Sequence, residues 1–140
     1  MSDIVRAKQA LLSGEYTCVL CKDGDTVTLT ERGVKPLVRL LQSGRSYVGY
    51  SAADKVVGRA TAFLYVLLGA REVYAKVMSK EALSVLRSAG IRTEIGTLCD
   101  NIINRRGDGI CPFEAAVLDI GDAREAYDAV LEKMKEMGIE

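Results

Sequence analysis

Three short stretches of the sequence combine residue types that could do chemistry. They are Asp54-Lys55 with Gly58-Arg59, Asn104-Arg105, and Cys111-Pro112 with Glu114. Their carboxylates, cationic groups and amide can hold a polar or anionic ligand, and the Cys111 thiol could also act as a nucleophile. We therefore expect these nine residues to bind a ligand, with Cys111 as the candidate catalytic residue.

The absence of histidine narrows this chemistry more than any other feature of the composition. The chain contains no histidine, which excludes Ser-His-Asp and Cys-His pairs, histidine-ligated metals and histidine acid–base catalysis. A reaction would have to use Cys, Asp, Glu, Lys, Tyr or a bound molecule. We expect neither a metal nor a cofactor.

Cys111 lies where a helix would begin. Pro112 suits the first helical position, and Glu114 could bond back toward the capping residue. A thiol at a helix N-terminus is favoured as thiolate. The same three residues are also ordinary helix-start residues, so Cys111 is either a nucleophile or a structural, ligand-lining residue.

Asp54 resembles an N-cap, and Gly58 and Arg59 follow it on the predicted helix. Lys55 and Arg59 could be solvated side chains one turn apart, or they could contact a ligand. Gly58 destabilises a helix relative to Ala, but it would let a neighbouring strand or a ligand approach the backbone closely. The loop at 104–109, which contains Asn104 and Arg105, could bind an anion or could be a surface turn.

Cys18 and Cys21 have the spacing of a zinc-finger pair, but they fall within a predicted strand. Residues three apart in a strand point to opposite faces, so a shared metal is disfavoured. We interpret these two cysteines as packed thiols, with metal binding or redox chemistry as the alternative.

The element that must position the candidate residues is a predicted central helix within residues 51–70. Its second half, 60–68, is apolar on nearly every side, and Gly69 follows as a stop signal. A helix without a polar face belongs in the middle of a domain. We expect its polar start, around Asp54, to form the floor of a ligand site.

The other elements follow from periodicity and turn residues. Strands are predicted at 16–22 and 25–31, joined by the Asp23-Gly24 hairpin signal, and then at 46–50, 72–78 and 91–98. Helices are predicted near the N-terminus, at 36–41, at 80–89, from Cys111, and after Asp122. Strands that alternate with helices imply parallel pairing. The predicted fold is α/β and three-layered: a mixed five-stranded sheet formed by an antiparallel hairpin and a parallel βαβαβ half.

The chain length and the balance of charges limit the number of domains and the kinds of partner to expect. We expect residues 1–140 to form a single domain. The 19 basic and 19 acidic residues balance, so no nucleic-acid partner is expected. The absence of a signal-like or spanning segment predicts a cytoplasmic protein with no membrane contact.

The layout and three short motifs resemble the cytidine-deaminase-like superfamily, in particular a small uncharacterised prokaryotic branch. The motifs are Asp-Lys-Val-Val-Gly-Arg-Ala at 54–60, Arg-Gly-Val-Lys-Pro-Leu at 32–37 and Gly-Ile-Cys-Pro-Phe-Glu at 109–114. Zinc deaminases carry His or Cys and then Ala-Glu at the first of these positions, and Pro-Cys-x-x-Cys at the next helix. Here those places read Val57-Gly58-Arg59-Ala60 and Met78-Ser79-Lys80-Glu81. The resemblance implies the deaminase-like fold without its zinc chemistry.

The sequence therefore predicts a zinc-independent protein that binds a small polar or anionic, nucleotide-like molecule. The alternatives are an enzyme with Cys111 as nucleophile, in which Asp54 or Glu114 handles protons, and an assembly protein that forms a homo-oligomer. In this fold the start of the central helix and the segment after the last strand share one edge of the sheet. We expect Asp54 and Cys111 to line one crevice there, into which two helix N-termini point.

Overall fold

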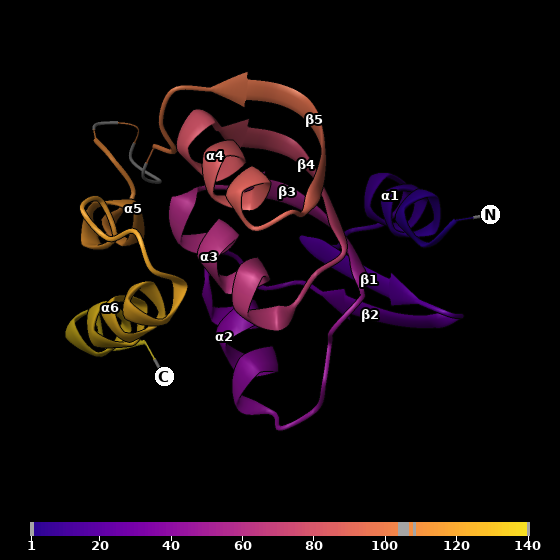
Figure 1. The fold of residues 1–140 in the computed structure, drawn as a ribbon, viewed down its shortest axis with the longest axis horizontal. Coiled ribbons are helices and arrows are strands. Elements are labelled where there is room, and N and C mark those ends of the chain that lie inside the picture. The colour runs from indigo at the N-terminus through magenta and orange to yellow at the C-terminus, as the bar shows by residue number, and fades with distance from the viewer. Residues whose placement is uncertain (1, 104–106, 108, 140) are drawn as a thin grey trace.

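The computed structural model describes residues 2–103, 107 and 109–139 (Figure 1). Its strands are β1 (Cys18–Lys22), β2 (Asp25–Leu29), β3 (Ser51–Val57), β4 (Glu72–Ser79) and β5 (Arg92–Cys99). Its helices are α1 (Asp3–Ser13), α2 (Lys35–Gln42), α3 (Arg59–Leu68), α4 (Lys80–Ser88), α5 (Pro112–Ala116) and α6 (Ala123–Glu136). The predicted order of helices and strands is confirmed.

The five strands form one mixed sheet in the order β2-β1-β3-β4-β5. β1 is antiparallel to both β2 and β3, whereas β3, β4 and β5 are parallel. This is the predicted α/β fold, an antiparallel hairpin joined to a parallel βαβαβ half. In the pairing of β1 with β3, Cys18 lies opposite Asp54.

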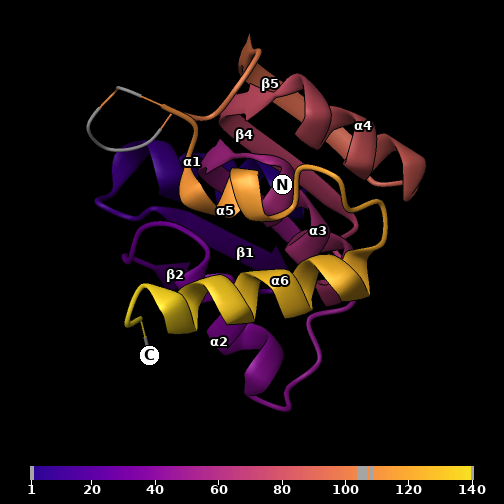
Figure 2. The same ribbon diagram turned by 90° about the vertical axis from the view of Figure 1, so that its left-hand side faces the viewer.

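Helices cover both faces of the sheet. On one face α1 buries Ala7 and Leu11 against Val19, Cys21 and Ala53. The other face carries α2, α3 and α4, and α6 packs against α3 (Figures 1 and 2). The sheet is thus the middle one of three layers, and α3 lies between the sheet and α6.

The hairpin turn forms as its sequence predicts. Asp23 and Gly24 both have positive φ, 47° and 88°, which matches the twist of the flanking strands. Cys18 and Cys21 point to opposite faces, since Cys18 packs in the core under α3 and Cys21 in the core under α1. The two thiols are therefore not arranged as a pair.

The predicted start of the central helix is wrong. Ser51–Val57 is a strand, and the helix begins only at Arg59, with Gly58 as its N-cap. The expected strand at 46–50 is instead part of the connection from α2. Asp54 and Lys55 are consequently strand residues rather than helix caps. Local propensity favours a helix here, but pairing with β1 on one side and β4 on the other supplies hydrogen bonds to both edges.

The remainder of the central helix agrees with its prediction. Leu64, Tyr65 and Ala62 have no exposed surface. The helix ends at Gly69, whose φ of 77° is left-handed. Within the described residues, no helix is both long and apolar enough to cross a membrane.

Candidate functional site

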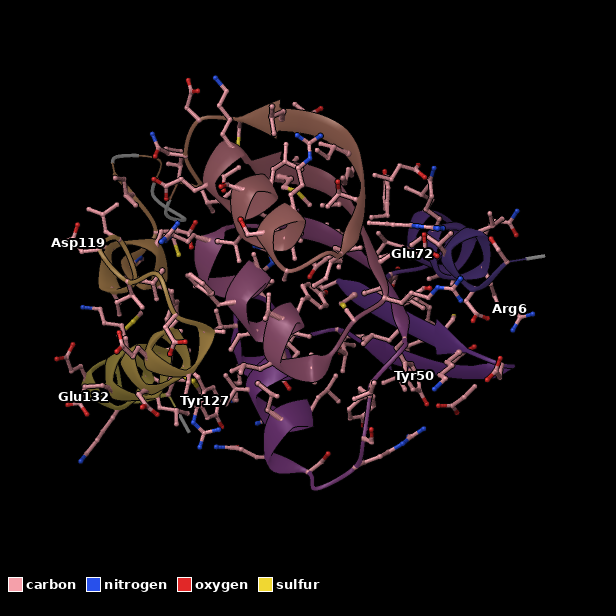
Figure 3. The ribbon with its side chains drawn as sticks, viewed as in Figure 1. Arg6, Tyr50, Glu72, Asp119, Tyr127 and Glu132 are labelled. Atoms are coloured by element: carbon pink, nitrogen blue, oxygen red, sulfur yellow. The ribbon has the colours of Figure 1, made fainter. Side chains whose placement is uncertain are left out.

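A cavity of about 440 Å³ lies where β3 ends and α3 begins. In Figure 3, Tyr50 and Glu72, which lie where β3 and β4 start, are on the opposite side of the molecule from Asp119, which follows α5. The polar lining of the cavity includes Thr17, Cys18, Glu31, Arg32, Asp54, Lys55, Thr61, Cys111 and Glu114. Its apolar lining includes Val34, Pro36, Leu37, Val56, Ala60, Ile102, Ile103 and Phe113. The carboxyl end of a parallel strand is where α/β folds hold ligands.

The structure brings most of the predicted site residues together. Asp54, Lys55, Gly58, Cys111 and Glu114 all line this cavity. Pro112 lines a neighbouring cavity of about 720 Å³, which shares seven lining residues with the first, Cys111 and Phe113 among them. Asn104 and Arg105 lie outside the described residues. The expected crevice shared by Asp54 and Cys111 is present as a cavity.

Arg59 is directed away from the cavity. Its guanidinium donates to the backbone oxygens of Val117, at 3.2 Å, and of Ile120, and it lies 5.0 Å from the ring centre of Phe63. These contacts tie the start of α3 to the chain that follows α5. Arg59 therefore has a structural position in this fold and does not line the predicted site.

Glu114 caps the central helix from a different element. One carboxylate oxygen accepts from the Arg59 amide at 2.6 Å, and the other accepts from the Ala60 amide at 2.8 Å. Burial raises the pKa of Glu114, while these two amides act in the opposite direction. The expectation that Glu114 bonds back to its own helix start is not met, because the carboxylate is turned toward α3.

This cap changes the predicted electrostatics of the site. The sequence predicts that the first amides of the central helix are free donors for an anion, yet two of them already bind Glu114. Helix α5 has five residues and no side-chain bond at its cap, Cys111. A helix this short has a small dipole, so the crevice is not formed by two unoccupied helix N-termini.

Gly58 provides space for the Glu114 cap. A Cβ on Gly58 would lie 2.3 Å from Glu114 Oε1, well inside contact distance. Its φ of −98° is open to any residue, so the requirement is for room rather than for an unusual backbone conformation. The sequence predicts a close approach to Gly58 by a strand or a ligand, and the approaching group is a side chain of the same protein.

Two residues that the sequence does not place at the site, Tyr65 and Cys18, lie beside Asp54. Tyr65 donates its hydroxyl to Asp54 Oδ2 at 2.6 Å, and Cys18 Sγ lies 3.0 Å from the same hydroxyl. Both are buried, with 0% and 3% of their surface exposed. A tyrosine in an otherwise apolar helix is a usable signal, because a buried hydroxyl needs a partner. Cys18 could be found only from the register of β1 on β3.

Burial sets the protonation of these three groups. It raises the pKa of Asp54 to about 6, against hydrogen bonds from Tyr65, from the amides of Val56 and Lys55, and from Cys18. Burial also raises the pKa values of Cys18 and Tyr65 well above their ordinary values. Near neutral pH the Cys18 thiol and the Tyr65 phenol are therefore uncharged donors. They surround the Asp54 carboxylate, which titrates about one pH unit below neutrality.

Among the described residues, no group of three or more Cys, Asp or Glu side chains is arranged to hold a metal ion. The site offers the buried carboxylate of Glu114, the partly buried carboxylate of Asp54, the partly exposed thiol of Cys111, and apolar walls. These groups can bind a polar molecule, and Asp54 can exchange a proton with it.

Two solved structures are similar to parts of the chain. One is an apo dCMP deaminase from the cyanophage S-TIM5, with a TM-score of 0.43 and 16% identity over 56% of this chain and 77% of that chain. The other is Acinetobacter baumannii RibD, with a TM-score of 0.43 and 20% identity over 89% of this chain and 39% of that chain. No protein with a curated description matches the sequence.

A much stronger similarity is to a DUF1893 family protein, TM1506, from Thermotoga maritima. Its crystal structure has a TM-score of 0.84 and 26% identity, over 95% of this chain and 91% of that chain. The sequence model of the same family, TM1506, a domain of unknown function (DUF1893), matches residues 6–134. The chain therefore belongs to the DUF1893 family.

Proposed function

We propose that this protein binds a small polar, nucleotide-like molecule in the cavity between β3, α3 and α5, without zinc chemistry. The observation that carries the proposal is a single cavity in which buried polar groups converge on an apolar wall. Its volume of about 440 Å³ is in the range of small-molecule sites.

The lining suits a flat ring with polar edges. Leu37, Pro36 and Phe113 offer apolar surface for the faces of a ring. Asp54 and Thr61 offer hydrogen-bonding groups for its edges. Arg32 and Lys55 line the same cavity and are exposed, so they lie at its rim, where a phosphate could meet them.

The test is a titration of isotope-labelled protein with cytidine, uridine, adenosine, guanosine and their 5′-monophosphates, followed by amide chemical shifts. Binding in the cavity should move the amides of Asp54, Lys55 and Cys111 in a saturable way. Thr61→Phe, which fills the cavity, should abolish these shifts. Ser84→Phe, in a pocket beside α4, should leave them unchanged. Shifts confined to residues outside the cavity would refute the proposal.

A second candidate function is an enzyme with Cys111 as its nucleophile. The observation in its favour is that Cys111 lines both cavities at their junction and keeps part of its surface exposed. Asp54 and Glu114 line the first of these cavities and could handle protons.

Alkylation rates separate the two functions. Cys18 and Cys21 are buried, so iodoacetamide should react mainly with the two partly exposed thiols, Cys99 and Cys111. Burial raises the pKa of the Cys99 thiol, which makes Cys99 a slow internal reference. In Cys99→Ser, fast modification of Cys111 near neutral pH that a nucleoside suppresses would favour the enzyme. Slow modification, similar to that of Cys99 in Cys111→Ser, would favour a binding protein.

A further inference from the structure

We infer that the part of the cavity lined by Asp54, Cys18 and Glu114, its deep end, recognises a group of the ligand that donates N–H hydrogen bonds or carries positive charge. Asp54 is its acceptor, and Tyr65 and Cys18 are the residues that position this acceptor. The inference rests on the proposed function, since it specifies which chemistry the same cavity selects.

The two carboxylate oxygens of Asp54 are held unequally. Oδ2 accepts the 2.6 Å bond from the Tyr65 hydroxyl, whereas Oδ1 accepts a longer one, 3.4 Å, from the Val56 amide. Asp54 lines the cavity and is only partly buried. The other two groups next to the carboxylate have partners of their own, since the Lys55 amide donates to the Thr17 oxygen at 3.1 Å and the Cys18 thiol lies 3.0 Å from the Tyr65 hydroxyl. Oδ1 is therefore the oxygen with more capacity for another donor.

The groups that surround Asp54 fix its orientation without neutralising its charge. Cys18 comes from β1 and Tyr65 from α3, and raised pKa values keep both neutral near pH 7. The charged groups that line the cavity with Asp54 are Glu114 from α5, Lys55 from β3 itself, and Glu31 and Arg32 from the chain before α2. Among the described residues none of these cations forms an ion pair with Asp54.

A second tyrosine–aspartate pair in the protein shows what is missing at Asp54. Tyr50, labelled in Figure 3, donates to Asp25 Oδ2 at the same distance, 2.6 Å. Arg45 completes that pair with an ion pair to Asp25, and the Tyr50 and Arg45 contacts lower the pKa of Asp25. The Tyr65–Asp54 pair has the same hydrogen bond but, within the described part of the chain, no cation paired with it. A donor group of the ligand would take the position that Arg45 has at Asp25.

The rest of the deep end disfavours an anion there. Glu114 is a second buried carboxylate, and it already accepts from the first amides of α3. The cations Arg32 and Lys55 are exposed. The cavity is therefore polarised: it accepts donors in its interior and offers positive charge at its rim, so a nucleotide-like ligand would enter with its N–H edge first.

Three planar probes of nearly equal shape test this polarity: benzamidine, benzamide and benzoate. They present a cationic pair of N–H groups, a neutral amide and an anion to the same cavity. Titrations followed by amide shifts of the cavity residues should give affinities in that order. Benzamidine should bind at least about tenfold more tightly than benzoate, as expected for a hydrogen bond to a charged group. Benzoate binding as tightly as benzamidine, or more tightly, would overturn the inference.

Asp54→Asn and Asp25→Asn are the matched variants, because each removes the charge from a tyrosine-bonded aspartate. Asp54→Asn should remove the preference for benzamidine over benzamide, and Asp25→Asn should preserve it. An unchanged preference in Asp54→Asn would contradict the role of Asp54. Melting curves and amide spectra of both variants report whether each is folded.

A measurement on the unmodified protein gives the same answer without relying on a variant. Because burial raises the pKa of Asp54 to about 6, a donor that favours its ionised form should release part of a proton when it binds near pH 6, and almost none near pH 8. Calorimetry of benzamidine in two buffers with different ionisation enthalpies measures that release. Equal release at both pH values would contradict the inference.

These experiments distinguish a wrong inference about Asp54 from a wrong proposal that the cavity binds a nucleotide-like molecule. If nucleosides move the cavity amides but the three probes show no ordering by charge, the cavity binds ligands and the inference about Asp54 is wrong. If neither nucleosides nor probes move these amides, both proposals are wrong.

Discussion

At the scale of single residues, Gly58 and Glu114 form the contact that joins the cavity to the core. Glu114 is 8% exposed and places both carboxylate oxygens on the first amides of α3. Those amides have no partner within the helix. The carboxylate can reach them because residue 58 has no side chain. A short side chain on Gly58 would therefore affect the start of α3 and one wall of the cavity together.

Gly58→Ala should destabilise the protein by about 2–4 kcal/mol, because the added Cβ displaces Glu114 and leaves buried amides and a buried carboxylate without partners. Chemical denaturation measures the loss. Gly121→Ala is the control, since its Cβ would meet no described atom within 4 Å. A Gly58→Ala/Glu114→Ala double variant should lose less stability than the sum of the losses in the two single variants. Full additivity would show that the two residues act independently.

Asp54 makes stability depend on pH in the direction opposite to most carboxylates. Its pKa is about 6 in the folded protein, against an ordinary value of 3.8. Below pH 3.8 Asp54 is protonated in both the folded and the unfolded protein, so its burial costs little stability. As the pH rises toward 6, the unfolded chain ionises while the folded chain resists ionisation, and stability falls.

Relative to Asp54→Asn, the natural protein should therefore lose about 1–3 kcal/mol of stability between about pH 4 and pH 7. Urea denaturation across this range measures the difference. Asp25→Asn should show the opposite trend, and at lower pH: the Tyr50 hydrogen bond and Arg45 hold the folded pKa of Asp25 below its ordinary 3.8, so the natural protein should lose stability relative to Asp25→Asn as the pH falls below about 4. A flat difference between the natural protein and Asp54→Asn would mean that Asp54 has an ordinary pKa.

At the scale of elements, α3 and the strand before it decide the architecture. The segment 51–68 is a central strand followed at once by a central helix, with Gly58 between them. The strand places Asp54 opposite Cys18 on β1, and the helix places Tyr65 over both. One continuous stretch of the chain thus supplies two of the three groups in the hydrogen-bonded cluster of Asp54, Tyr65 and Cys18.

Truncation of the core face of α3 should be costly. Leu64 is fully buried, so Leu64→Ala should reduce the free energy of unfolding by about 2–5 kcal/mol. Leu67 is only partly buried, and Leu67→Ala should cost less. Leu12→Ala on α1, where the side chain is 59% exposed, should change stability by about 0.5 kcal/mol or less. Equal, small losses at Leu64 and Leu12 would contradict the central position of α3.

At the scale of the whole molecule, the cavity is assembled from segments that are far apart in the sequence. Its lining comes from β1, the start of α2 and the chain before it, β3, the start of α3, the chain after β5, and α5. Figure 2 shows α5 and α6 in front of α3, on the side where the chain returns after β5. The site therefore depends on the complete fold rather than on one local motif.

The protein as purified should hold far less than one zinc ion per chain. The reason is chemical: the sequence has no histidine, and no group of three or more Cys, Asp or Glu side chains in the described part of the chain is arranged to hold a metal ion. Inductively coupled plasma mass spectrometry of protein expressed with added zinc measures the content. One zinc per chain that disappears in Cys111→Ser would overturn this prediction.

Patterns along the chain were enough to predict the order of helices and strands, the hairpin turn and the burial of α3. Each of these depends on neighbours in sequence: an Asp-Gly turn, a run of apolar residues, or a cap such as Asp122, whose side chain accepts from the Glu125 amide. The same patterns misassigned 51–57 as part of a helix, because alanine and lysine favour helices unless other strands pair with them.

The residue pattern alone therefore predicts the α/β class and the set of polar residues available for chemistry. How these residues are used depends on the folded arrangement: Arg59 faces away from the cavity, Glu114 caps a helix from another element, and Tyr65 and Cys18 surround Asp54. The physical reason is that helix and strand periodicities are local, whereas the partner of a buried polar group is chosen by strand register and packing between segments distant in the chain.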